Sequence, residues 1–182
     1  MPIQKYFIAL VVPEPFQAEL MELKNEVKDL FNSKGALRSP AHITLHMPFE
    51  WKEEKEAVLL NTLQQFTFNG SFNIELQNFS CFEPRVLFVD VVKNESLEKL
   101  QNELVIYVKK NLRLFNQADD MRGFHPHVTI AFRDLKKEQF YNALPYFKTK
   151  TYNASFEMKS FYLLKHIDKE WQVYKEFVFT NN

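Results

Sequence analysis

Residues 42–45 are His-Ile-Thr-Leu, and residues 127–130 are His-Val-Thr-Ile. Each tetrad is a histidine, an apolar residue, a threonine and a second apolar residue. In a β-strand, side chains two positions apart project from the same face, so we expect each histidine beside its threonine and the apolar pair facing a core. Roughly 0.08 such tetrads are expected by chance in a chain of this composition. Two of them indicate a functional feature built on two strands.

The apolar periodicity around the tetrads predicts alternating strands and helices. We expect strands over 7–12, 41–49, 72–76, 86–92, 126–133, 155–165 and 171–179. We expect helices over 16–31, 96–114 and 138–144, and a further helix that begins within 52–56 and extends to 66. The order strand–helix–strand–helix occurs about twice, with one tetrad in each half. The sequence therefore predicts the α+β class, with antiparallel sheets flanked by helices, two similar lobes and one domain over 1–182.

The charge balance restricts the class of nucleic-acid partner. Lys plus Arg and Asp plus Glu are 23 each, so the formal net charge is zero. Proteins that hold long nucleic acid through its backbone usually carry a basic excess, because counterion release supplies much of that affinity. We therefore expect a small or end-bound phosphate substrate rather than a long duplex.

Cysteine count and hydropathy favour an intracellular setting. Cys81 is the single cysteine and cannot form an internal disulfide, which argues against an oxidised secreted scaffold. The apolar run 6–12 is too short for a membrane span. The sequence predicts a cytoplasmic monomer that does not associate with a membrane.

The paired histidines suit acid–base chemistry on a phosphodiester. Hydrolysis needs one group to deprotonate the attacking water and another to protonate the leaving oxygen, and histidine serves both because its pKa lies near neutrality. The threonine hydroxyls can donate hydrogen bonds to the phosphate oxygens. The spacings His42/His46 and His125/His127 would allow zinc, but no carboxylate or thiolate cluster accompanies them. We therefore predict no metal and no cofactor.

The whole chain resembles a known superfamily. The tetrads stand 85 positions apart (127 minus 42), after an opening Lys-Tyr-Phe-Ile-Ala-Leu-Val-Val-Pro-Glu-Pro at 5–15 and before a closing Phe-Tyr-Leu-Leu at 161–164. In these features the chain resembles the two-histidine phosphoesterases, the group of the 2′-5′ RNA ligases and RNA 2′,3′-cyclic phosphodiesterases. The resemblance implies a bilobal, pseudo-twofold duplication whose two halves face each other across a central cleft. It assigns catalysis to four residues: His42, Thr44, His127 and Thr129.

The same resemblance implies a reaction. We expect a metal-independent hydrolase that opens a 2′,3′-cyclic phosphate, or a related cyclic or 2′-5′ phosphodiester, on RNA ends or small nucleotides. Ligation of RNA ends through a 2′-5′ bond is the same chemistry reversed, and the sequence leaves it open. A module that binds RNA ends or nucleotides without turnover is the alternative from another class. Within the site, either histidine can serve as the base, depending on how the ester docks, and we favour His127 as the base and His42 as the acid.

One departure from the family affects substrate binding. Many members carry an arginine where this chain has Phe132, and Arg133 follows one position later. The cationic contact to phosphate is therefore missing, shifted through a bulge, or supplied elsewhere, with these candidates: Arg38, Arg85 and Arg122. Phe132 can instead stack on a base. In regular strands His46 and His125 share the face of the catalytic residues, so both are expected in the cleft wall.

Overall fold

The protein is described by a computed structural model that covers residues 2–116 and 123–180. Its elements along the chain are β1 (Ile3–Val11), α1 (Phe16–Phe31), β2 (His42–Lys52), α2 (Glu56–Gln64), β3 (Phe72–Phe82), β4 (Val86–Val91), α3 (Glu95–Leu112), β5 (His127–Ala131), α4 (Lys137–Lys148), β6 (Asn153–Met158), β7 (Ser160–Ile167) and β8 (Glu170–Val178). Short 3-10 turns lie at Gly35–Arg38 and Glu53–Lys55. The α+β class is confirmed.

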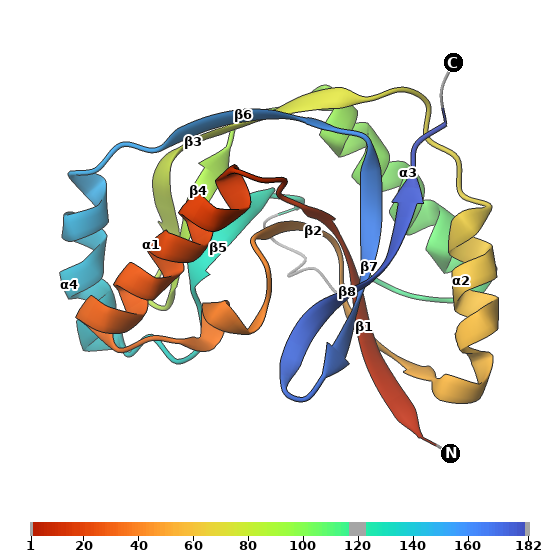
Figure 1. The fold of residues 1–182 in the computed structure, drawn as a ribbon, viewed down its shortest axis with the longest axis horizontal. Helices are drawn as coiled ribbons and strands as arrows, with labels where there is room; N and C mark the ends of the chain where they lie inside the picture. The colour runs from red at the N-terminus through yellow and green to blue at the C-terminus, as the bar shows by residue number, and fades with distance from the viewer. Residues whose placement is uncertain (1, 117–122, 181–182) are drawn as a thin grey trace.

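The strands form one sheet in the order β6-β3-β4-β5-β2-β1-β7-β8, and every pairing is antiparallel. Helices α1 and α4 lie at one end of the molecule and α2 and α3 at the other, which gives two lobes (Figure 1). The separate sheets predicted from the sequence are joined, because β2 and β5 pair at Ile43 and Val128. The duplication itself stays a prediction.

The segment 155–165, predicted as one strand, is two strands. β6 ends at Met158 and pairs with β3, while β7 begins at Ser160 and pairs with β1. Five strands separate β6 from β7 in the sheet order, which would be about 29 Å across a flat sheet. One residue, Lys159, spans far less than that. The sheet must therefore curl, and the crossing from one lobe to the other follows the top edge in Figure 1.

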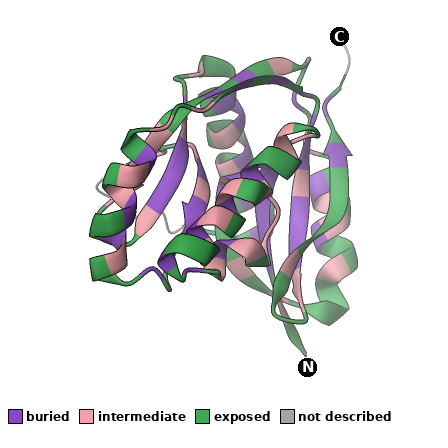
Figure 2. Cartoon of the chain, turned by 60° about the vertical axis from the view of Figure 1, so that its left-hand side comes forward, coloured by how far each residue is buried: buried purple, intermediate pink, exposed green. Residues whose placement is uncertain are grey.

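The two faces of the sheet differ in what covers them. Helix residues such as Leu20 and Leu104 share one large buried core with Ile43 and Val128. The opposite face, which we call the motif face, carries a smaller cluster formed by Phe7, Ala9 and Leu164. Buried residues gather in the strands and on the inward sides of the helices (Figure 2). The helix-covered face thus forms the main core, and the motif face has only the smaller cluster.

A carboxylate fixes the β7–β8 hairpin to the first turn of α2. Glu56 accepts hydrogen bonds from Tyr6, from Lys165 at 2.7 Å and from Tyr174 at 2.7 Å. The three donors come from β1, β7 and β8, so a single side chain holds these strands together. In the same hairpin, Trp171 lies at the start of β8 and packs against Phe7.

Candidate active site

The two motif strands lie side by side at the centre of the sheet. Ile43 of β2 is opposite Val128 of β5, and both are buried in the main core. The residues on either side of this pair project to the motif face, because side chains alternate along a strand. When the antiparallel register is continued by one residue in each direction, each histidine lies across from the threonine of the other tetrad. His42 is opposite Thr129, and Thr44 is opposite His127. All four are half-buried.

Both motif histidines are held in the same way. The Nδ1 atom of His42 lies 2.7 Å from the carbonyl oxygen of Pro40, and Nδ1 of His127 lies 2.7 Å from the carbonyl oxygen of His125. A carbonyl oxygen only accepts, so each Nδ1 carries the proton and donates. Each Nε2 is then the atom left for a substrate. The two imidazoles are thereby oriented for proton transfer before any ligand binds.

His42 lies in a dry and cationic environment. Its ring packs 4.8 Å from that of Phe7, centre to centre. Burial and then the charge of Lys24 lower the pKa of His42 to about 4, against the hydrogen bond to the Pro40 carbonyl, which raises it. The unliganded His42 is therefore neutral near physiological pH.

His127 has an aromatic environment with a carboxylate nearby. Its ring lies 4.7 Å from Phe88 and 5.1 Å from Phe82. Burial lowers the pKa of His127, and the charge of His125 lowers it as well, while the hydrogen bond to the His125 carbonyl and the charge of Asp90 raise it. Asp90 is the register partner of His127 on β4. The two histidines thus share a hydrogen-bonding pattern but not an electrostatic environment.

The prediction for His46 is wrong. Ala9 pairs with Thr44, but the preceding residue Ile8 pairs with His46, so β2 has an extra residue at this point. Such a bulge reverses the alternation, and His46 turns into the main core. It is 1% exposed, packs against Phe49, and its Nε2 has no hydrogen-bond partner among the described residues. His46 therefore cannot line a substrate site on the motif face.

His125 does lie beside the motif. Its Nε2 is 3.2 Å from Oδ1 of Asp90, and its ring is 5.3 Å from that of Phe82. Its backbone carbonyl holds His127, as described above. Arg85, by contrast, is an exposed residue in the β3–β4 turn, where its backbone N–H donates to the Phe82 carbonyl. A substrate contact by Arg85 stays a prediction.

The segment after the second tetrad contains a bulge. Thr129 pairs with Phe88, while Ala131 pairs with Leu87 and is buried in the main core. The next side chain, Phe132, is 40% exposed, and the guanidinium carbon of Arg133 lies 4.9 Å from its ring centre. The phosphate contact and base stacking predicted here remain untested. Of the other candidate cations, Arg38 is exposed at the end of a 3-10 turn, and Arg122 lies outside the described residues.

Sequence reasoning missed several residues of the motif face and its support: Phe7, Lys24, Phe82, Phe88, Asp90 and Trp171. For Lys24 a signal existed. It stands at a buried position of α1, between Leu20 and Val27 at helical spacing. The aromatic residues carried no local signal, because a phenylalanine in a strand is usually a core residue and the pattern does not show which face it joins.

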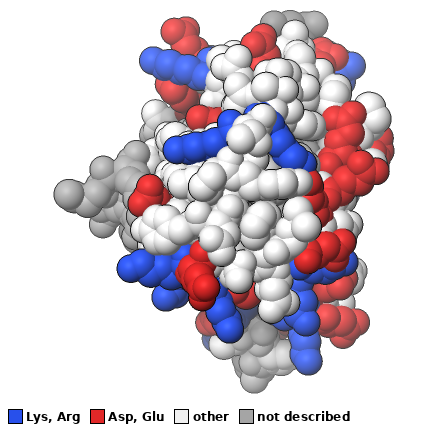
Figure 3. Space-filling view, turned by 90° about the vertical axis from the view of Figure 1, so that its left-hand side faces the viewer, with Lys and Arg blue, Asp and Glu red and all other residues white. Residues whose placement is uncertain are grey.

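No three His, Cys, Asp or Glu side chains of the described chain converge to hold a metal ion. None of the described helices is long and apolar enough to cross a membrane. On the face of α1 and α4, Lys and Arg are interspersed with Asp and Glu, so that side presents no continuous basic field (Figure 3).

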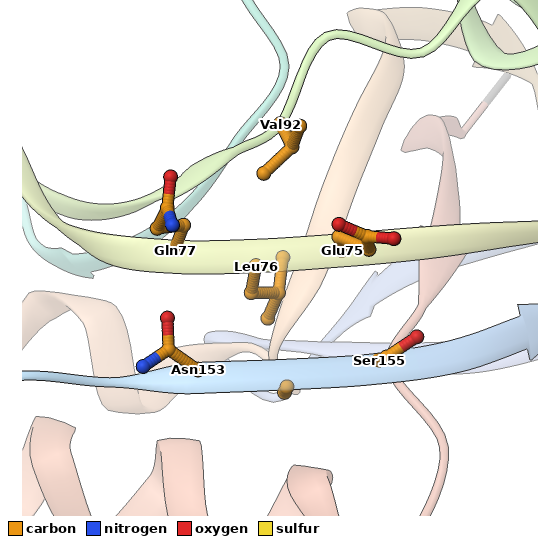
Figure 4. Close-up of a pocket in the computed structure, with 7 residues that line it drawn as sticks. Glu75, Leu76, Gln77, Val92, Asn153 and Ser155 are labelled. Atoms are coloured by element: carbon orange, nitrogen blue, oxygen red, sulfur yellow. The ribbon is translucent and has the colours of Figure 1, made fainter.

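A surface hollow lies away from the tetrads, at the β3–β6 edge. Glu75, Leu76 and Gln77 from β3 line it together with Asn153 and Ser155 from β6 (Figure 4). Its lining contains no histidine or other residue of β2 and β5. The hollow offers amide, hydroxyl and carboxylate groups but no acid–base pair, so it is not the candidate site.

Comparisons with known sequences find a family profile and several relatives. The profile of the 2′-5′ RNA ligase superfamily matches residues 12–170. A candidate phosphoesterase of Bacillus pumilus is 28% identical over 169 residues, covering 88% of this chain and 91% of that protein. Another, from Geobacillus kaustophilus, is 28% identical over 178 residues, covering 96% and 95%.

Two solved structures share the fold. TT0787 of Thermus thermophilus superposes with a TM-score of 0.67 at 19% identity, covering 98% of this chain and 99% of that one. LigT of E. coli gives a TM-score of 0.68 at 17% identity, covering 99% of each chain. Other solved structures of LigT are complexes with 3′-AMP, NADP+, ATP and phosphate.

Proposed function

Because the chain belongs to the 2′-5′ RNA ligase superfamily, we propose that it is a phosphodiesterase that uses His42, Thr44, His127 and Thr129 as its catalytic residues. Its substrates are 2′,3′-cyclic phosphates, or related cyclic or 2′-5′ phosphodiesters, on RNA ends or nucleotides. The observation that carries the proposal is the pair of imidazoles on adjacent strands, each oriented by a 2.7 Å hydrogen bond from Nδ1. The candidate phosphoesterases among its relatives support the same reaction class.

The arrangement suits a hydrolysis in which water attacks phosphorus opposite the leaving oxygen. One Nε2 accepts a proton from the water while the other donates a proton to the departing oxygen. The threonine hydroxyls, on the same face, donate hydrogen bonds to the nonbridging oxygens and hold the ester in line. The histidines and threonines supply proton transfer and orientation themselves, so no step of this scheme requires a metal.

Aromatic rings beside the tetrads support a nucleoside substrate. Phe7 and Trp171 lie on the His42 side, with ring centres 4.8 Å apart, and Phe82 and Phe88 lie on the His127 side. Of these rings, Trp171 and Phe82 are partly exposed and can stack on a base, whereas Phe7 and Phe88 are buried. The nucleotide complexes of LigT, which shares the fold, favour the same class of ligand.

The test is a panel of 2′,3′- and 3′,5′-cyclic nucleotides, cyclic-ended oligonucleotides and 2′-5′ dinucleotides, with each product identified as the 2′- or 3′-phosphate. We expect turnover that persists in EDTA and falls at least a thousandfold in His42→Ala and in His127→Ala. Thermal unfolding of both variants serves as the control for the fold. A purified protein without turnover on every ester of the panel would sink the proposal, and loss of activity on chelation would refute its metal-free form.

Two other activities are outcomes of the same experiment. Ligation is supported by the name of the superfamily, and it would appear as joining of a cyclic-ended fragment to a hydroxyl-ended fragment at a rate comparable to hydrolysis. A binding module would retain nucleotide affinity in both alanine variants, while the parent protein would show no turnover. Two oriented imidazoles argue against pure binding, since binding alone needs no proton transfer.

A further inference from the structure

The hydrogen bonds of the motif do not distinguish a base from an acid. His42 and His127 each donate from Nδ1 to the carbonyl two residues earlier, at the same distance. An in-line hydrolysis nevertheless needs one of them neutral and the other protonated at the start of the step. The distinction must therefore come from groups outside the two tetrads.

A buried lysine stands behind His42. Lys24 of α1 is 1% exposed, and its Nζ donates to the carbonyl oxygen of Ser39 at 2.9 Å. The next carbonyl along the chain, that of Pro40, is the one that holds His42. The ammonium and the imidazole are thus fixed to consecutive peptide groups. Lys24 and His127 are the positively charged or titratable groups that act on His42.

A carboxylate stands beside His127 instead. Asp90 is directly across from His127 in the β4–β5 pairing, and its Oδ1 accepts from His125 at 3.2 Å. His125 then holds His127 through its backbone carbonyl. The charged or titratable groups that act on His127 are thus His125, which lowers its pKa, and Asp90, which raises it.

We propose that Lys24 and Asp90 are positioning residues that give the two histidines different roles, so that His42 is the base and His127 is the acid. The inference rests on the proposed function, and it reverses the roles predicted from the sequence. A neighbouring positive charge favours the neutral imidazole that can accept a proton. A neighbouring carboxylate favours the imidazolium that can give one up.

The proton and bond changes of the step balance. Water attacks phosphorus and loses a proton to Nε2 of His42, while the bond from phosphorus to the ribose oxygen breaks. That oxygen takes the proton from Nε2 of His127. The products are a phosphate monoester, a protonated His42 and a neutral His127, and exchange of protons with solvent restores the starting state.

The environment of each group agrees in direction. Burial and then Lys24 lower the pKa of His42. Burial and the charge of His125 lower that of His127, and Asp90 is the charged group that raises it. Burial also lowers the pKa of Lys24 to about 7, so the lysine holds its proton on the acid side of neutrality. That is the pH range in which His42 titrates.

The first experiment is an NMR titration of the two imidazoles, which needs no substrate. In the wild type we expect His42 to titrate below His127. Lys24→Met should raise the pKa of His42 by about one unit, because it removes the positive charge that lowers it, and Asp90→Asn should lower that of His127. Lys28→Met, one turn further along α1 with a 41% exposed side chain, is the matched control and should change neither. His42 titrating at or above His127, or unmoved in Lys24→Met, overturns the proposal.

The second experiment changes the leaving group. p-Nitrophenolate departs without an acid, so His127→Ala should be less impaired on a 2′-deoxynucleoside 3′-(p-nitrophenyl phosphate) than on a cyclic nucleotide. The ratio of variant to wild-type activity should be at least about a hundredfold higher on the first ester than on the second. His42→Ala should be impaired on both esters. The opposite pattern overturns the assignment but leaves the proposed function standing. No turnover by the wild type on these two esters or on any ester of the panel refutes the proposed function itself, and the assigned roles with it.

Discussion

Lys24→Met is expected to stabilise the protein at mildly acidic pH and to lose that advantage as the pH rises. The Lys24 side chain is 1% exposed, and burial lowers its pKa to about 7. In the unfolded chain the same amine is in water, where its pKa is about 10.4. At about pH 6 folding must therefore bury a charge that methionine does not carry.

The sign and size of the effect follow from proton linkage. Between about pH 7 and pH 10 the unfolded chain binds the proton and the folded chain does not, so the free energy of unfolding of the wild type rises with pH. Three pKa units at about 1.4 kcal/mol each give about 4 kcal/mol over that interval. The methionine variant lacks this rise. It also leaves the Ser39 carbonyl unpaired, a cost of about 1–3 kcal/mol at every pH, so the wild type should be the more stable protein at about pH 10.

The assay is urea unfolding of wild type and variant at about pH 6, 8 and 10. Lys28→Met, on the exposed side of the same helix, should change the free energy of unfolding by less than about 0.5 kcal/mol at each pH. A difference between Lys24→Met and wild type that stays constant across the range would refute the reasoning. It would mean that the ammonium is hydrated in the folded protein.

Three further predictions concern neighbouring features. His46→Phe should leave kcat/KM within about twofold and raise stability by about 1 kcal/mol, because it removes a buried Nε2 that has no hydrogen-bond partner among the described residues. A tenfold loss of kcat/KM with an intact fold would return His46 to the site. Trp171→Ala should raise KM for a cyclic nucleotide about tenfold with little change in kcat, since a stacked base contributes about 1–3 kcal/mol, and an unchanged KM would place the base elsewhere. Gly35→Ala should lower the midpoint of thermal unfolding, because its Cβ would lie 2.8 Å from Oδ1 of Asp134 and 2.9 Å from the Phe132 carbonyl oxygen. An unchanged midpoint would show that the segment of Phe132 and Asp134 shifts to make room for the methyl group.

The elements of the fold could be predicted from local pattern, and their connections could not. The apolar stripe of 16–31 predicted α1 at the observed bounds. The single strand predicted over 155–165 was wrong because alternation continues through Lys159, and nothing local shows that β6 and β7 join strands at different places in the sheet. Pairing between distant segments depends on the whole sheet and leaves no periodic trace.

The same limit applies to the site. The tetrads placed His42 and His127 on strands, and these strands proved to be neighbours. His46 was misplaced because a bulge reverses the alternation, and a bulge is decided by the pairing of β1 with β2 rather than by the sequence of β2 alone. Asp90 was missed for a related reason, since its place beside His127 exists through the β4–β5 register.

An antiparallel pair of like tetrads makes its reactive groups nearly equivalent, since each histidine donates to the carbonyl two residues before it and lies across from the threonine of the other strand. Such a pair could dock a cyclic ester in either direction, with either ribose oxygen leaving. Lys24 comes from α1 and Asp90 from β4, so neither belongs to the equivalent pair. If these two groups set the roles of His42 and His127, they also set which direction is productive, because the leaving oxygen must face the acid. The electrostatics around the motif would then decide whether the product is the 2′- or the 3′-phosphate.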